Sequence, residues 1–159
     1  MLRTAILAAL TLIPTAGQAQ TLQLEAVFET ACVEPFDLFF GETEDNLRDL
    51  GFGIFPNDDW TTVEHPRNGM QGFYSSNPED MFCSIYDPSG NPVTADRAAQ
   101  VLLGAYFDKT PIALSPSSVG VSAWGIPEGG CCHLVIEIRN RSPQDIPGGA
   151  EMALYLRDR

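Results

Sequence analysis

The segment CHLVIEIR, residues 132–139, has the alternating pattern of a β-strand. Successive side chains of a strand point to opposite faces, so its even-numbered positions share one apolar face and its odd-numbered positions share the other. The segment EMALYLRD, residues 151–158, alternates in the same way, and the polar connection NRSPQDIPGG joins the two runs. We therefore expect them to pair as an antiparallel hairpin with one face in the core.

Further strands are expected nearer the N-terminus. The candidates are VSAWGI (121–126) and the pair FYSS (73–76) and MFCSIY (81–86), which flank the turn NPED as a second hairpin. In the last of these, Cys83 and Ile85 share one face with Met81. Residues 53–72 are rich in turn-forming residues and are expected to be irregular, with Phe55 and Trp60 as hydrophobic anchors.

Three segments have the signals of helices: TLQLEAVFETACVE (21–34), TEDNLRDLG (43–51) and VTADRAAQVLLGAYF (93–107). The expected buried stripe of the first is Leu24, Val27, Phe28, Ala31 and Cys32. Thr43 is the expected N-cap of the second helix and Thr94 that of the third. The expected buried stripe of the third is Ala98, Val101, Leu102 and Ala105.

These elements predict a single α+β domain over residues 20–159. We expect two layers, with a mostly antiparallel sheet packed against two helices. No internal repeat, low-complexity tract or linker divides the chain. About 140 residues are enough to bury roughly two-thirds of the unfolded surface in one core.

The first 19 residues have the features of a secretory signal peptide. Arg3 supplies a basic start, residues 5–13 form an apolar run, and residues 17–19 are a small-x-small cleavage site. About nine apolar residues fall well short of the roughly 20 that span a bilayer. We expect cleavage after Ala19, no membrane insertion afterwards, and a periplasmic or secreted protein.

The chain is acidic, with a formal net charge of −12. Loss of Arg3 with the signal peptide makes the mature chain one unit more negative. An acidic surface repels the phosphates of nucleic acids and of anionic lipids, so neither is an expected partner. A protein or a small molecule remains as the expected partner.

No catalytic or cofactor-binding residue can be assigned from motifs. GVSAW, residues 120–124, begins like a nucleophile elbow, but Trp124 stands where that motif needs a second glycine. The chain has no H-E-x-x-H, no phosphate-binding glycine loop and no C-x-x-C. A hydrolase that uses scattered carboxylates stays open as a minor alternative.

Cysteines stand at positions 32, 83, 131 and 132, and export predicts that they are largely oxidised. Cys32 and Cys83 both fall on faces expected to meet between helix and sheet. A bridge there would close a loop of about 50 residues and stabilise the fold by roughly 4 kcal/mol. The alternatives join either of them to Cys131 or Cys132.

The stretch GGCCHL, residues 129–134, has the most suggestive chemistry. In a regular strand the side chains of Cys131 and Cys132 diverge, but the two preceding glycines could bend the backbone enough for a vicinal disulfide. The same cysteines with His133 are weak candidates for a metal-binding or thiol-redox site. Zinc usually takes four ligands, whereas Cu(I) takes fewer.

A signal peptide, FETAC (28–32), CSIY (83–86) and the amphipathic helix that follows resemble small exported alphaproteobacterial proteins of unknown function. The resemblance covers residues 20–107. It implies export and a Cys32–Cys83 disulfide, and it implies no activity. The pair Cys131–Cys132 is not part of the pattern.

The leading functional hypothesis is an exported, non-catalytic binding or interaction module, because no catalytic constellation is recognisable. The alternative is a metal-binding or thiol-redox protein that uses Cys131, Cys132 and His133. The apolar stretch PFDLFFG, residues 35–41, is a candidate partner patch. It can equally seat the loop between the first two helices.

Overall fold

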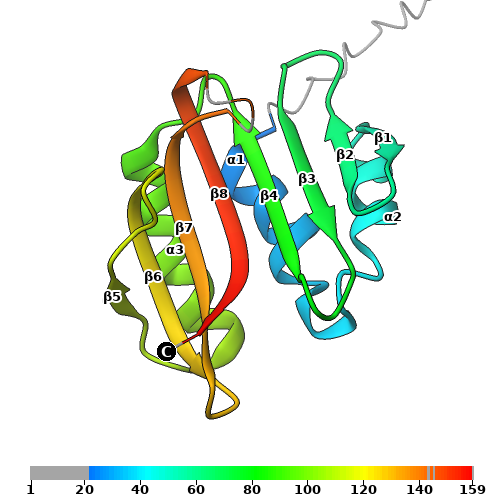
Figure 1. Cartoon of the computed structure of the whole chain (residues 1–159). Helices are drawn as coiled ribbons and strands as arrows, with labels where there is room; N and C mark the ends of the chain where they lie inside the picture. Colours follow the sequence, from blue (N-terminus) through cyan, green and yellow to red (C-terminus); the bar gives the residue numbers. More distant parts are fainter. Residues whose placement is uncertain (1–21, 143, 145, 159) are drawn as a thin grey trace, which may run out of the picture.

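The computed structural model describes residues 22–142, 144 and 146–158 (Figure 1). The strands are β1 (Gly53–Pro56), β2 (Thr61–Glu64), β3 (Gln71–Ser75), β4 (Phe82–Asp87), β5 (Ile112–Leu114), β6 (Gly120–Glu128), β7 (Cys132–Arg141) and β8 (Pro147–Asp158). The helices are α1 (Leu24–Phe28), the π-helical turn η1 (Glu29–Val33), the 3-10 turn η2 (Phe36–Leu38), α2 (Thr43–Asp49) and α3 (Pro92–Phe107).

The strands form one antiparallel sheet in the order β1-β2-β3-β4-β8-β7-β6-β5. This order divides into two four-strand meanders that meet where β4 pairs with β8. Helices precede each meander, α1 and α2 before β1 and α3 before β5. The predicted α+β class with a mostly antiparallel sheet is confirmed. The predicted signal peptide, residues 1–19, lies outside the described residues.

The main core lies between the sheet and the helices α1 and α3, which run behind the sheet in Figure 1. α1 contacts β4 and β8, and α3 contacts β6, β7 and β8. The pairing expected from the opening segment is confirmed, with Ile136 of β7 opposite Leu154 of β8. Both side chains are fully buried. Burial of each such side chain is worth about 1.5–3 kcal/mol, so the long central strands carry much of the hydrophobic stabilisation.

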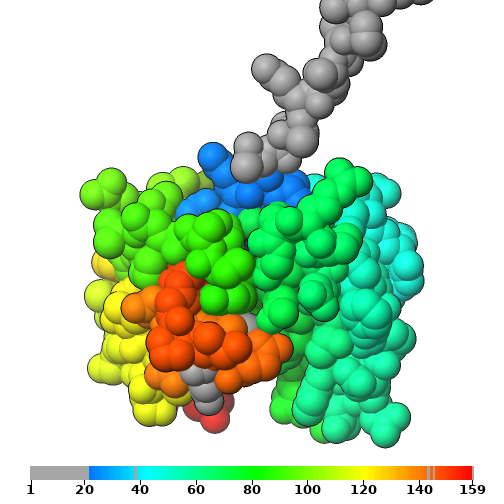
Figure 2. All heavy atoms as spheres, turned by 90° about the horizontal axis from the view of Figure 1, so that it is seen from above, coloured from blue at the N-terminus to red at the C-terminus, as the bar shows by residue number. Residues whose placement is uncertain are grey.

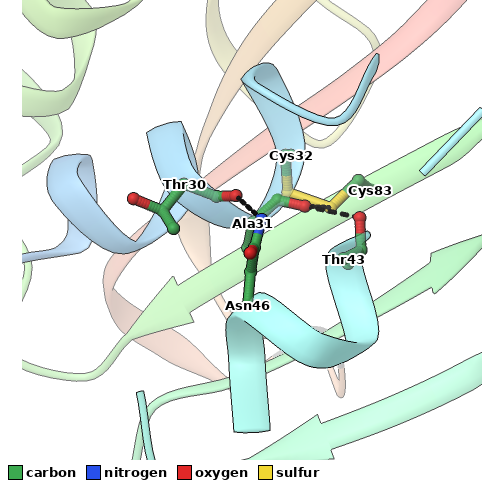
Figure 3. Close-up of a disulfide and its surroundings, with 6 residues drawn as sticks. All are labelled: Thr30, Ala31, Cys32, Thr43, Asn46 and Cys83. Atoms are coloured by element: carbon green, nitrogen blue, oxygen red, sulfur yellow. Dashed lines mark hydrogen bonds between the residues drawn. A yellow bond between two sulfur atoms is a disulfide. The ribbon is translucent and has the colours of Figure 1, made fainter. Parts of the chain in front are cut away.

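The first helix connects to the sheet and to α2 (Figure 3). Its five predicted stripe residues are all buried. Cys32 of η1 is disulfide-bonded to Cys83 of β4, with Cα atoms 5.6 Å apart. The Ala31 carbonyl accepts a 2.7 Å hydrogen bond from the Thr43 hydroxyl. The prediction that Thr43 caps α2 is therefore wrong. Glu42 occupies the N-cap position, and the Thr43 hydroxyl donates its hydrogen bond to a carbonyl of η1.

The prediction that residues 53–72 are irregular is wrong. β1 and β2 form there as a hairpin, and each is four residues long. Strands this short leave too few alternating positions to stand out among the surrounding turn residues. Phe55 is 54% exposed and Trp60 is 50% exposed, so neither anchors the segment in the core as expected.

The third helix is confirmed, but it buries a different stripe from the predicted one. Asn91 is its N-cap and accepts a hydrogen bond from the backbone N–H of Val93, so Thr94 is not the cap. The buried residues are Ala95, Ala99, Leu102 and Leu103. Val101, expected inside, is 67% exposed. The apolar pairs Ala98–Ala99 and Leu102–Leu103 make two neighbouring faces of α3 similar in hydrophobicity. Packing against the sheet decides which of these faces is buried. The short strand β5 was not predicted.

Candidate functional site

The sheet face opposite to α1 and α3, called the outer face below, carries three stacked aromatic side chains. On β4 the alternation that turns Cys83 and Ile85 toward the helices turns Phe82 to the outer face. The Phe82 ring stacks on Phe73 of β3 and on Tyr155 of β8, with centroids 4.7 Å and 6.1 Å apart. We call Phe73, Phe82 and Tyr155 the aromatic row. It forms a continuous apolar surface across three neighbouring strands.

Two hollows adjoin the aromatic row. One has a volume of about 420 Å³ and includes Phe82, Arg139 and Tyr155 in its lining. The other, called the aspartate pocket, has a volume of about 580 Å³, and its lining includes Asp58, Asp59, Trp60, Phe73, Asp80 and Phe82. Asp80 and Phe82 line both hollows, so the two adjoin each other. These volumes lie within the range of ligand sites.

Figure 2 shows the molecule from above, with the orange segment before β8 and the teal strands β1 and β2 standing out on either side of a hollow. The strands that bear the aromatic row lie between these two projections in the sheet order. At the end of the sheet seen in this view, the surface is therefore recessed between these two projections.

Beneath this surface, Glu137 of β7 is fully buried under the segment that joins β5 to β6. Its carboxylate accepts hydrogen bonds from the Ser117 backbone N–H at 2.8 Å and hydroxyl at 2.7 Å, from Arg139 Nε at 2.8 Å and from the Tyr155 hydroxyl at 3.0 Å. Burial raises the pKa of this carboxyl, but the donors outweigh burial and hold the pKa below its ordinary value. The charge of Glu137 is thus fully compensated inside the protein.

A second buried carboxylate, Glu151 of β8, lies opposite Arg139 in the strand register. Arg139 Nη1 is 3.5 Å from Glu151 Oε1, and Glu151 is only 1% exposed. Desolvation raises its pKa more than Arg139 lowers it. Among the buried side-chain nitrogen and oxygen atoms of the described residues, Glu151 Oε1 and the hydroxyl oxygen of Ser84 on β4 have no hydrogen-bond partner. Two buried glutamates thus share one arginine, and their pKa values move in opposite directions.

Carboxylate pairs with separated pKa values are typical of acid–base enzymes, but the positions of these two do not suit catalysis. A general acid or base must come within hydrogen-bond reach of the substrate. Glu137 and Glu151 are 0% and 1% exposed, and neither lines an adjoining hollow. A molecule in the hollows would meet Arg139, whose guanidinium lies 5.8 Å from the centre of the Phe82 ring. The glutamates therefore fix Arg139 and Tyr155 in place.

The stretch GGCCHL spans the turn between β6 and β7 and the first residues of β7. Cys131 is exposed, Cys132 is partly buried, and the two are joined in a vicinal disulfide. Gly129 and Gly130 precede them with φ of +58° and +100°, in the region where glycine is favoured. His133 is partly buried. Within residues 22–142, 144 and 146–158, no group of three or more His, Cys, Asp or Glu side chains is arranged to hold a metal ion.

The phenylalanines of PFDLFFG lie mainly inside the protein. Phe40 is 1% exposed, and Phe36 packs edge-on against Phe40 and against Phe107 of α3. Phe39 alone of these three phenylalanines is exposed, and its φ is +52°. The cluster therefore seats the loop between α1 and α2 and offers little surface to a partner.

The aromatic row and the buried glutamates are not among the site residues predicted from sequence. One signal was available, since Phe82 belongs to the face of its strand opposite to Cys83. A second was Glu137, a charged residue between the apolar residues Ile136 and Ile138 of one strand. Neither signal shows that β3, β4 and β8 are neighbours, and this order is what brings the rings together.

Comparison of the chain with protein-family models, with curated proteins and with solved structures found no match. Among the described residues, no helix combines the length and the apolar character needed to cross a membrane.

Proposed function

We propose that the protein is an exported, non-catalytic binding module that holds its partner on the outer face. In this proposal α1 and α3 form one layer and the sheet forms the other, so the second face of the sheet is left for the partner. The signal-like segment at residues 1–19 and the oxidised cysteines support export.

The observation that carries the proposal is the aromatic row with its adjoining hollows. Trp60 and Phe55 extend the aromatic surface toward β1 and β2, and both are about half exposed. Aromatic side chains are enriched in protein interfaces, where rigid rings lose little entropy on binding. The network around Glu137 holds Tyr155 before any partner arrives, which lowers the cost of binding.

A second candidate function is thiol–disulfide exchange at Cys131 and Cys132. The observation that favours it is the exposure of Cys131, which leaves the vicinal disulfide open to an external thiolate. Reduction by a dithiol donor would transfer two electrons and two protons, giving two thiols here and a disulfide on the donor. The metal-binding form of this alternative would need the same reduction first, because both sulfurs are engaged in the disulfide.

Site-specific photo-cross-linking in the native host tests the main proposal. Trp60 is replaced by p-benzoylphenylalanine, and as a control the same residue replaces Val101, which is exposed on α3. We expect a discrete adduct from position 60 and none from position 101, with the partner identified by mass spectrometry. Equal adducts from both positions, or none from position 60, would contradict binding on the outer face.

A further inference from the structure

The aspartate pocket combines aromatic rings with uncompensated negative charge. Trp60, Phe73 and Phe82 contribute the rings, and no Lys, Arg or His side chain is among its lining residues. Asp58 and Asp59 lie on the turn between β1 and β2, and Asp80 lies on the turn between β3 and β4. In the described part of the chain, these three carboxylates make no hydrogen bond or ion pair. The pocket therefore has the electrostatic character of a site for a cation.

We infer that this pocket binds arginine side chains of a basic segment in a partner protein. The inference rests on the proposed function, because it names the occupant of the same outer face. Guanidinium groups stack on aromatic faces and form paired hydrogen bonds with carboxylates, which makes arginine a better match than lysine for rings beside aspartates. The molecule itself shows the fit, because the Arg139 guanidinium lies over the Phe82 ring at 5.8 Å.

Two features indicate a segment rather than a single free cation. The aspartate pocket shares Asp80 and Phe82 with the neighbouring hollow, whose lining also includes the Glu79 carboxylate and the Arg139 guanidinium. The two adjoining hollows thus offer separate sites to different side chains of one extended segment. The net charge of −12 would attract a basic protein from a distance and speed its association.

Fluorescence anisotropy with two labelled peptides tests this inference on the purified mature protein. One peptide alternates arginine with glycine, and the other has citrulline, the neutral isostere, at every arginine position. We expect at least tenfold tighter binding of the arginine peptide. Asp58→Asn/Asp59→Asn should weaken its binding about tenfold. Glu42→Gln/Asp108→Asn makes the same change of net charge at exposed positions elsewhere and should weaken it less than twofold.

Each other outcome overturns the inference in a distinguishable way. Equal binding of the citrulline peptide would refute a cationic occupant and leave the outer face as a binding surface. Equal weakening by the two double variants would show that only net charge matters. Free arginine that competes as strongly as the peptide would point to a small molecule. No binding of either peptide, beside a cross-linked adduct at position 60, would show that the partner is of another class.

Discussion

At the scale of single residues, Glu137 and Glu151 show how neighbours decide what a buried carboxylate does. Glu137 accepts hydrogen bonds from three different residues, which replace the water that it loses on burial. Glu151 has Arg139 Nη1 at 3.5 Å and the Ser84 hydroxyl nearby, but desolvation still outweighs both and raises its pKa. Although the two side chains are equally buried, the pKa of Glu137 is lowered and that of Glu151 is raised.

Substitution of the two glutamates should give unequal losses of stability. We expect Glu137→Gln to lower the free energy of unfolding at pH 7 by about 2–4 kcal/mol, because it removes the buried charge that pairs with Arg139. Glu151→Gln should cost about 1 kcal/mol or less, since ionisation of Glu151 is already disfavoured. Urea denaturation of both variants measures the difference. Equal losses would contradict the assigned roles.

The two carboxyls also predict opposite dependences of stability on pH. The pKa of Glu137 is lowered, so its contribution is present above about pH 4.5 and is lost as pH falls through its folded-state pKa. The pKa of Glu151 is raised, so its contribution is present below about pH 4.5 and is lost as pH rises through its folded-state pKa. In urea denaturation across acidic pH, the deficit of Glu137→Gln should shrink as pH falls. A constant deficit would refute the lowered pKa.

The two disulfides should differ in their resistance to reduction. Cys32 and Cys83 are 0% and 1% exposed, whereas Cys131 is exposed. We expect dithiothreitol to reduce Cys131–Cys132 in the folded protein and to leave Cys32–Cys83 intact until urea is added. Alkylation and mass spectrometry of peptides identify the reduced cysteines. Reduction of Cys32–Cys83 first would contradict the assigned burial.

At the scale of elements, the spacing of apolar residues predicts those helices and strands that are long enough to repeat the spacing several times. β7 and β8 are long enough for alternation to show, and the buried stripe that runs through α1 and η1 fits helical spacing at every position. Alternation of apolar and polar residues does not reveal β1 and β2, because each is only four residues long. The spacing of apolar residues also fails to select the buried face of α3, because paired alanines and leucines fit two adjacent faces. In these cases tertiary packing makes the choice that local preference leaves open.

The buried face of α3 can be tested with matched truncations. Leu103 is 0% exposed, so Leu103→Ala should lower the free energy of unfolding by about 3 kcal/mol through lost burial and a residual cavity. Val101 is 67% exposed, so Val101→Ala should change it by less than about 0.5 kcal/mol. Thermal or urea unfolding of the two variants compares them. A larger loss of stability for Val101→Ala than for Leu103→Ala would instead support the buried stripe predicted from sequence.

At the scale of the whole molecule, the fold consists of two helix-and-meander halves joined between β4 and β8. Cys32–Cys83 ties the helix of the first half to its last strand, next to this junction. The predicted class could be derived from sequence, because it depends on the types of element. The candidate site could not, because the aromatic row depends on strands separated by more than 60 residues becoming neighbours.

Removal of Cys32–Cys83 should lower the free energy of unfolding much more than removal of Cys131–Cys132. Cys32 and Cys83 are 51 positions apart, so replacing both with alanine should lower the free energy of unfolding by about 4 kcal/mol. Replacing Cys131 and Cys132 with serine is the control, since adjacent residues enclose almost no loop. It should cost less than about 1 kcal/mol. Urea denaturation measures both variants. A greater loss in the control would contradict the assigned role of the buried bridge.

The central claim is that a partner covers the outer face, and hydroxyl-radical footprinting measures this most directly. The protein is oxidised in purified form and in the native cell fraction that contains it, and mass spectrometry compares each side chain. We predict that oxidation of Phe55 and Trp60 falls severalfold in the native fraction, while that of Tyr106 on α3 is unchanged. Unchanged oxidation of Phe55 and Trp60, or protection of Tyr106 instead, would contradict the claim.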